Sequence, residues 1–449
     1  MTPFPTQLSG AAFLAANQYA LLADEPRVGK TGAAIIAADC VMAETILVIT
    51  TASGRGVWKR GFADWSVFDR SIQVVEGNPR SITADVVIVG WPALTSPRIV
   101  TALHQRRWSL IISDEDHFAK NFEAKRTQAL YGVPLDDGEH LNNLTALYAR
   151  ADRVWPLTGT PLPHSPADMY PRLRALAPDR LKANAARGWP DVMKHGDFLH
   201  RYCIVKMKKL SQFRRIPVVI GGRNLPELRD RLEGFILRRT QEDVGIRPPI
   251  HDLLPLIVPK ARRDACMANV DQAVILEAAD RGDTKSLEMH LGPLRRITGE
   301  IKAHAVVEAV KDEFQCGLDK IVLAYWHKDV GRILMEGLAE FGVTGIDGAT
   351  PDAARTVNAE RFAKDPKCRV FLGQIEAAGE SIDLSAAAVM WFVETVFSPK
   401  SMKQMSLRIT NYSQKRQAVV KVCVLEGSID EALQASLLRL WTAIREVLQ

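Results

Sequence analysis

The chain has 449 residues, a length that predicts two or three domains at about 150 residues each. Hydrophobic residues make up 47% and charged residues 24%, which excludes a mainly disordered or collagen-like chain. Lysine and arginine outnumber aspartate and glutamate by 58 to 52, so the net charge is +6. This mild excess is compatible with a nucleic-acid partner without identifying one.

The 6 cysteines are scattered and form no CxxC pair, which argues against a zinc ribbon or a thioredoxin-type site. Residues 1–23 carry no charged side chain, but they lack a basic n-region and contain Pro3 and Pro5, unlike a signal peptide. The longest strongly apolar run, Leu384 to Val393, is about half a membrane span. We therefore expect a cytoplasmic protein without a membrane partner.

Short apolar runs alternate with helical patterns, which is typical of α/β units with parallel sheets. The runs predicted to be buried strands are 45–50, 86–89, 110–113, 154–157, 320–324, 370–372, 389–393 and 419–425. They form two groups, and Arg247-Pro248-Pro249 between them predicts a linker. Residues 201–239, also between the groups, hold 11 basic and 3 acidic residues. Residues 428–448 show a capping box and apolar spacing that predict a C-terminal helix.

A phosphate-binding loop is indicated by Gly29-Lys30-Thr31, which precedes an apolar, alanine-rich helical pattern. Backbone N–H groups of such a loop wrap phosphates, and the helix start adds its positive dipole. Lys30 would reach the β- and γ-phosphates, and the Thr31 hydroxyl would ligate Mg²⁺. Alone, the three residues are a weak signal, because they also occur by chance before such helices.

Two carboxylates, Asp114 and Glu115, end the predicted strand 110–113, about 85 residues after the loop. Asp114 can hold the water shell of Mg²⁺, and Glu115 can polarise an attacking water as general base. An acidic loop after a strand is common, but this one follows the phosphate loop at a suitable distance for the same sheet. Arg408, in the second half of the chain, could be an arginine finger in cis, although a solvated helix face is the plainer reading of its segment.

In order, these segments resemble the superfamily 2 ATPases of the Swi/Snf-type DNA translocases, and in particular their annealing-helicase (HARP-like) branch. Similar segments are 4–7 (the upstream glutamine motif), 24–31 (motif I), 114–117 (motif II), 157–161 (motif III), 378–384 (motif V) and 404–414 (motif VI). The resemblance covers essentially the whole chain, and an ordered set of motifs is far more specific than any one of them.

The resemblance implies two tandem RecA-like domains, 1–245 and 246–449, with parallel sheets flanked by helices and with ATP between them. It also implies a basic insertion at about 162–240 and a helical insertion at about 260–312. The residues it assigns to ATP are Gln7 (for the adenine), Asp24, Glu25, Gly29, Lys30, Thr31, Gly379, Asp383 and Gln404. It assigns catalysis to Lys30, Asp114, Glu115 and Arg408, and Mg²⁺, held through water, to Thr31 and Asp114.

Contact with DNA is expected from Lys208, Lys209, Arg214 and Arg215 in the basic stretch, unless they are ordinary solvated charges. Thr158 and Thr160 of the motif III segment would couple the nucleotide state to that contact. The chain departs from the family pattern at Arg27 and Ser381, where the family has glycine, and at Asn411, where it has a second motif VI arginine. Loss of a finger can cost roughly 10³–10⁵ in rate, so the expected catalysis is slow.

The leading hypothesis is a monomeric translocase that uses ATP and Mg²⁺ on double-stranded or branched DNA. Because the chain is short for the family, we expect a minimal motor from a bacterial cell or a virus-infected host cell. Asn411 and Ser381 motivate an alternative, a nucleotide-gated DNA-binding or scaffold protein with weak ATPase activity. A further alternative keeps the fold and makes the chain a strand-separating DNA or RNA helicase.

Overall fold

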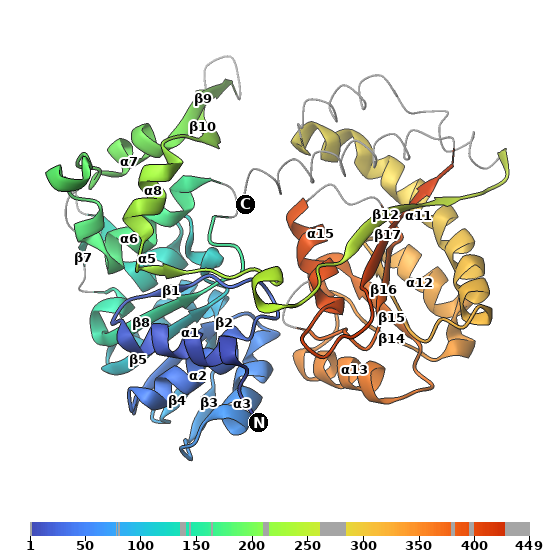
Figure 1. The fold of residues 1–449 in the computed structure, drawn as a ribbon, viewed down its shortest axis with the longest axis horizontal. Helices are drawn as coiled ribbons and strands as arrows, with labels where there is room; N and C mark the ends of the chain where they lie inside the picture. The colour runs from blue at the N-terminus through green and yellow to red at the C-terminus, as the bar shows by residue number, and fades with distance from the viewer. Residues whose placement is uncertain are drawn as a thin grey trace. The chain divides into compact units, whose positions relative to one another are not determined.

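The computed structural model describes residues 2–77, 79, 81–134, 141–142, 145–162, 165–209, 215–260, 284–378, 382–394 and 399–426. The chain divides into two compact units, Met1–Thr240 and Gln241–Gln449, each with its own parallel sheet (Figure 1). The predicted C-terminal helix at 428–448 lies outside the described residues.

The main sheet of the first unit has the strand order β11-β1-β8-β5-β2-β4-β3, and all of its pairings are parallel. Its strands are β1 (Leu21–Leu22), β2 (Ile46–Thr50), β3 (Ile72–Val74), β4 (Val86–Gly90), β5 (Trp108–Asp114), β8 (Ala151–Leu157) and β11 (Ile236–Leu237). Because parallel strands all end at one edge of the sheet, the segments that follow them gather there, where open α/β sheets bind ligands.

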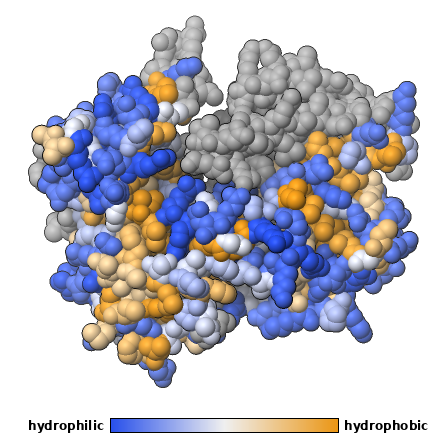
Figure 2. All heavy atoms as spheres, in the orientation of Figure 1, coloured by the Kyte–Doolittle hydropathy of each residue, from blue (hydrophilic) through white to orange (hydrophobic). Residues whose placement is uncertain are grey.

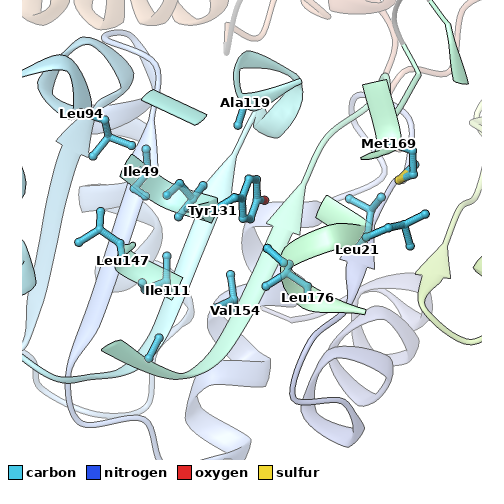
Figure 3. Close-up of a cluster of buried hydrophobic side chains, with 14 of the residues drawn as sticks. Leu21, Ile49, Leu94, Ile111, Ala119, Tyr131, Leu147, Val154, Met169 and Leu176 are labelled. Atoms are coloured by element: carbon cyan, nitrogen blue, oxygen red, sulfur yellow. The ribbon is translucent and has the colours of Figure 1, made fainter. Parts of the chain in front are cut away.

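Helices cover both faces of this sheet, because successive residues of each strand point to opposite sides. Ile46 and Val48 of β2 pack with α1 (Pro5–Ala16), α2 (Lys30–Cys40) and α3 (Gly54–Trp65). Leu47 and Ile49 belong to the opposite cluster, part of which Figure 3 shows. That cluster includes residues of α4 (Pro97–His104), α5 (Lys125–Tyr131), α6 (Tyr170–Leu176), α7 (His195–Tyr202) and α8 (Leu225–Leu232).

Two small antiparallel pairs complete the described strands of the first unit. One joins β6 (Val133–Pro134) to β7 (Leu141–Asn142). The other is a ribbon of β9 (Cys203–Lys209) and β10 (Arg215–Gly222), which Figure 1 shows as an extension beyond α7 and α8. The basic stretch of the sequence thus contains a ribbon and a helix.

The second unit has a six-stranded sheet in the order β12-β17-β16-β13-β15-β14, again with parallel pairings throughout. Its strands are β12 (Ile250–Leu256), β13 (Ile321–Tyr325), β14 (Val343–Ile346), β15 (Val370–Gln374), β16 (Val389–Phe392) and β17 (Val419–Leu425). Its described helices are α11 (Thr284–Gln315), α12 (Lys328–Gly337), α13 (Asp352–Lys364), α14 (Ile375–Ala378) and α15 (Pro399–Ser406). Buried clusters lie on both faces of the sheet, so this unit repeats the three-layer build of the first.

Every predicted buried strand is present, and the expectation of two α/β domains with parallel sheets is confirmed. Within the two main sheets, the prediction missed β1, β3, β11, β12 and β14, which are short or lie at or next to a sheet edge, and it also missed the two antiparallel pairs of the first unit. None of the helices in the described part of the chain is both long and apolar enough to cross a membrane. On the face drawn in Figure 2, hydrophilic side chains cover much of the described surface, with apolar patches between them.

Candidate active site

The phosphate-loop segment of the first unit connects β1 to α2, and Lys30 is the first residue of that helix. Its N-cap, Gly29, has φ +100° and ψ 27°, a left-handed conformation that suits glycine. The Lys30 Nζ donates to the backbone carbonyls of Asp24, at 2.7 Å, and of Glu25, at 3.2 Å. The ammonium group therefore folds over the loop that would cradle phosphates, and Thr31 follows it in the first turn of α2.

Gln7 packs directly against this loop. Its side chain is 4% exposed, and its Oε1 accepts the backbone N–H of Phe4 at 2.9 Å. A Cβ on Gly29 would lie 2.8 Å from the Gln7 Cγ, and one on Gly32 would lie 2.4 Å from its Nε2. Only glycine at these two positions allows so close an approach, so the segment assigned to the adenine does lie beside the phosphate loop.

Asp24 is held by Arg239, at the end of the first unit. The two side chains form an ion pair, and the Arg239 backbone N–H also donates to Asp24 Oδ1 at 3.0 Å. The Arg239 guanidinium further donates to the carbonyl of Thr6 at 2.7 Å and to the hydroxyl of Ser9 at 2.6 Å. One arginine thus ties the start of the loop to α1, and the Asp24 side chain is turned toward this contact.

Asp114, the last residue of β5, is fixed by neighbouring strands and helices. Its Oδ2 accepts hydrogen bonds from the Thr50 hydroxyl and from Trp58 Nε1, both at 2.8 Å, and its backbone carbonyl accepts one from Trp91 Nε1 at 2.9 Å. Burial first, and the Glu115 carboxylate second, raise the pKa of Asp114, while the hydrogen bonds from Trp58 and Thr50 and the charge of Lys30 act in the other direction. A carboxylate that Lys30 favours in its charged form offers oxygen atoms of the kind Mg²⁺ and its water shell bind, so the residues present fit this ion.

Glu115 lies in the left-handed region, with φ 50° and ψ 45°. Its Oε2 is 3.1 Å from the Nδ1 of His117. The same ring nitrogen is 3.4 Å from the Thr158 hydroxyl and 3.5 Å from the Thr160 hydroxyl, and the Thr160 N–H donates to Thr158 Oγ1 at 3.1 Å. The structure therefore brings the motif II and motif III segments into one hydrogen-bonded cluster, in which His117 is the link.

The residues assigned in the second unit lie around the segment after α15. Arg408 is 6% exposed within the 3-10 turn Leu407–Ile409, and its carbonyl accepts the Leu384 N–H at 3.0 Å. The Asn411 Nδ2 donates to the Ser385 hydroxyl and, at 3.4 Å, to Asp383 Oδ2. The motif V and motif VI segments are thus in contact with each other. Gln404 lies half-buried on α15.

Other assigned residues cannot be placed at the level of side chains. Gly379 and Arg214 lie outside the described residues, as does Ser381, where the chain departs from the family pattern. Lys208 and Lys209 are on β9 and Arg215 is on β10, and of these three residues only the backbone is described. Their role in binding DNA stays a prediction.

Three anchors of the site were not predicted from the sequence: Thr50, Trp58 and Trp91, which all hold Asp114. Trp58 is 0% exposed and Trp91 2% exposed. In the sequence, a buried tryptophan cannot be told from an ordinary core residue. The one available signal was position, because Thr50 ends β2 and Trp91 follows β4, at the same edge of the sheet as Asp114.

Comparison with known protein families gives two matches. Residues 7–258 match the SNF2-related domain, and residues 302–413 match the helicase conserved C-terminal domain. The first match covers more than half of the chain, and the two together include every residue assigned to ATP, Mg²⁺ or catalysis, from Gln7 to Arg408.

Curated relatives cover almost the whole chain. It is 24% identical to the DNA annealing helicase and endonuclease ZRANB3 of Bos taurus, over 97% of this chain and 39% of that protein. It is 27% identical to the SWI/SNF-related matrix-associated actin-dependent regulator of chromatin subfamily A-like protein 1 of Xenopus tropicalis, over 98% of this chain and 44% of that protein. The chain therefore spans about two fifths of the length of these relatives.

A solved structure, the Sulfolobus solfataricus SWI2/SNF2 ATPase core in complex with dsDNA, aligns with 97% of this chain and 90% of its own. The TM-score is 0.45 and the identity 18%.

Proposed function

The chain belongs to the SNF2-related family, and on that premise we propose that it is an ATP-driven translocase acting on double-stranded or branched DNA. The observation that carries the proposal is the cluster at one edge of the first sheet, where Lys30, Asp114, Glu115 and His117 lie together with the motif III threonines. The similarity to a relative named as a DNA annealing helicase and endonuclease also supports the proposal.

Each residue assigned to ATP, Mg²⁺ or catalysis has a distinct task in this proposal. Lys30 exchanges its two backbone carbonyls for the β- and γ-phosphates of ATP, and Gln7 reads the adenine from α1. Thr31 and Asp114 would hold Mg²⁺ through its water shell, and the ion supplies positive charge against the phosphates. Glu115 takes the proton of the attacking water as general base. Arg408 of the second unit balances the charge of the transferring phosphoryl group.

His117 can relay the state of the site to motif III, because its Nδ1 has alternative partners. When this nitrogen carries a proton, it can donate to Glu115; without one, it can accept from the hydroxyl of Thr158 or Thr160. A change at Glu115 during hydrolysis would therefore reach the Thr158–Thr160 segment. We propose that this exchange couples hydrolysis to the grip on DNA.

The grip itself would be the basic ribbon of β9 and β10. Phosphate contacts dominate such binding and make it steeply dependent on salt, with little preference for sequence. Neutralising the four proposed contacts should lower the affinity for duplex DNA and reduce the slope of log K against log salt by up to about 3.6, at about 0.9 per contact. These contacts are Lys208, Lys209, Arg214 and Arg215. A matched control neutralises exposed cations of the second unit: Arg332, Arg361, Lys364 and Lys367. If the slope of log K against log salt is the same for the two sets of variants, the four ribbon residues are ordinary solvated charges and not DNA contacts.

The test of the whole proposal is ATP turnover with and without duplex DNA. Wild type should be stimulated by the duplex, and Lys30→Ala should lose turnover. Lys59→Ala, an exposed lysine on α3, serves as the matched control and should behave like wild type. Turnover that DNA does not stimulate, or that survives Lys30→Ala, would contradict the translocase.

A second candidate function rests on Asn411, which has no positive charge to offer and whose amide binds the motif V segment. In this alternative the chain binds DNA under the control of nucleotide and hydrolyses ATP weakly. Duplex binding that depends on ATP, together with turnover that stays at its basal rate, would favour it. A strand-separating DNA or RNA helicase would instead release a labelled strand from a partial duplex.

A further inference from the structure

Asp116 occupies the third position of the motif II segment, where the Swi/Snf-type DNA translocases have alanine or glycine. Its side chain is 0% exposed. One carboxylate oxygen accepts hydrogen bonds from the Ser113 hydroxyl at 2.8 Å and the Tyr131 hydroxyl at 2.7 Å, and the other forms an ion pair with Arg172. A buried charge is therefore fully paired immediately after the proposed general base.

Arg172, on α6, is also 0% exposed, and its remaining donors bind backbone carbonyls. They reach Asp116 at 2.9 Å, Pro161 at 3.1 Å and Asp168 at 2.8 Å. Burial alone would lower the pKa of this guanidinium, but Asp116, together with Tyr131 and Asp168, raises the pKa above its usual value. One charged arginine thus joins the backbone of motif II to the Pro161 end of motif III.

Glu115 lies between two fixed residues. Asp114 is held on one side by Thr50 and Trp58, and Asp116 is held on the other by Arg172. Glu115 adopts the left-handed backbone conformation. Residues other than glycine rarely adopt it, and they do so only where the surrounding contacts impose it. The ion pair behind Asp116 is one of these surroundings.

We propose that Asp116 and Arg172 form a positioning pair, which holds Glu115 and the Thr158–Pro161 segment in the geometry that hydrolysis requires. The proposal rests on the ATPase function given above. Stability alone does not account for the pair, because apolar residues of similar size often replace a buried ion pair at no cost to the fold. The pair would instead set the rate of the chemical step.

The experiment separates these two roles by removing both charges together. Asp116→Ala and Arg172→Met are made singly and combined, and Asp39→Ala/Arg70→Met is the matched control. Asp39 and Arg70 form a similarly buried ion pair at the far end of α2, with side chains 8% and 6% exposed. Melting temperature, kcat and KM for ATP are measured at saturating duplex DNA.

We expect each single variant to lose stability, because it leaves a buried charge unpaired. The double variant should regain a melting temperature close to wild type, yet show a kcat about 10- to 100-fold lower, with KM for ATP within about twofold. The control pair should keep the wild-type kcat. A double variant with both wild-type stability and wild-type kcat would overturn the proposal.

Two further measurements decide the matter if the double variant fails to fold or if wild type does not hydrolyse ATP. Tyr131→Phe removes the hydroxyl that donates to Asp116 and also interacts with Ser113, while the ring stays in the apolar cluster of Figure 3. It should lower kcat several-fold, and an unchanged kcat contradicts positioning. Hydrogen exchange needs no turnover: Tyr131→Phe and any folded double variant should exchange faster than wild type in peptides covering 113–119 and 157–162. Unchanged exchange refutes the pair's role, whereas absent wild-type turnover refutes only the proposed function.

Discussion

Replacing Trp58 by phenylalanine tests whether the Asp114 carboxylate is preorganised to hold Mg²⁺ through its water shell. The substitution removes the hydrogen bond from Trp58 Nε1 to Asp114 Oδ2, which is 2.8 Å long. A hydrogen bond to a charged group contributes about 1.5–3 kcal/mol. This bond also helps to lower the pKa of Asp114, so its loss shifts the buried carboxyl further toward the protonated form, which binds Mg²⁺ poorly.

If the whole contribution serves the ionised carboxylate, the concentration of Mg²⁺ at half-maximal ATP turnover should rise about 10- to 150-fold, since 1.4 kcal/mol corresponds to a factor of ten. The assay is steady-state turnover at saturating duplex DNA and excess ATP, while free Mg²⁺ is varied. At saturating Mg²⁺ much of the wild-type rate should return.

Trp108→Phe is the matched control. Trp108 is equally buried, its Nε1 donates to the Leu103 carbonyl at 3.0 Å, and it begins the strand that Asp114 ends, about 20 Å away at about 3.3 Å per residue. Both variants should lose about 1–3 kcal/mol of unfolding free energy, because each leaves a small cavity. Only Trp58→Phe should change the Mg²⁺ dependence. An unchanged Mg²⁺ requirement, or an equal change in both variants, would refute the role of Asp114 in holding Mg²⁺.

Three other predictions concern the same machinery. Glu115→Gln should keep nucleotide affinity, measured with a fluorescent ATP analogue, and lose hydrolysis, because the amide cannot take a proton; wild-type turnover would remove Glu115 as the general base. Asn411→Arg should raise DNA-stimulated turnover by restoring a positive charge, and Arg408→Ala should abolish most of it; no effect from either would mean that this segment does not serve the nucleotide. In the absence of nucleotide, the stability of Asp114→Asn relative to wild type should increase as the pH rises. The raised pKa of Asp114 makes its folded carboxyl favourable at low pH and costly once ionised, so a difference that does not vary between about pH 4 and 8 would contradict the raised pKa.

The sequence by itself determined the α/β class, the buried strands and the identity of the loops at their ends. Parallel strands that are covered on both faces read as continuous apolar runs, so β5 and β17 are visible without any structure. The phosphate loop is equally local, because its chemistry depends on adjacent residues from Gly29 to Thr31. The left-handed conformation of Gly29 is also a local matter, because glycine has no Cβ to oppose it.

Only the tertiary structure decided which side chains hold those loops in place. Trp58 and Asp114 are separated by 56 residues, as are Asp116 and Arg172, and Asp24 and Arg239 are separated by 215. Hydrogen bonds and ion pairs depend on distances of about 3 Å between atoms, and these distances are set by how strands and helices are placed in the sheet. A buried tryptophan or arginine carries no local mark of its partner, because the partner comes from another part of the chain and meets it only in the fold.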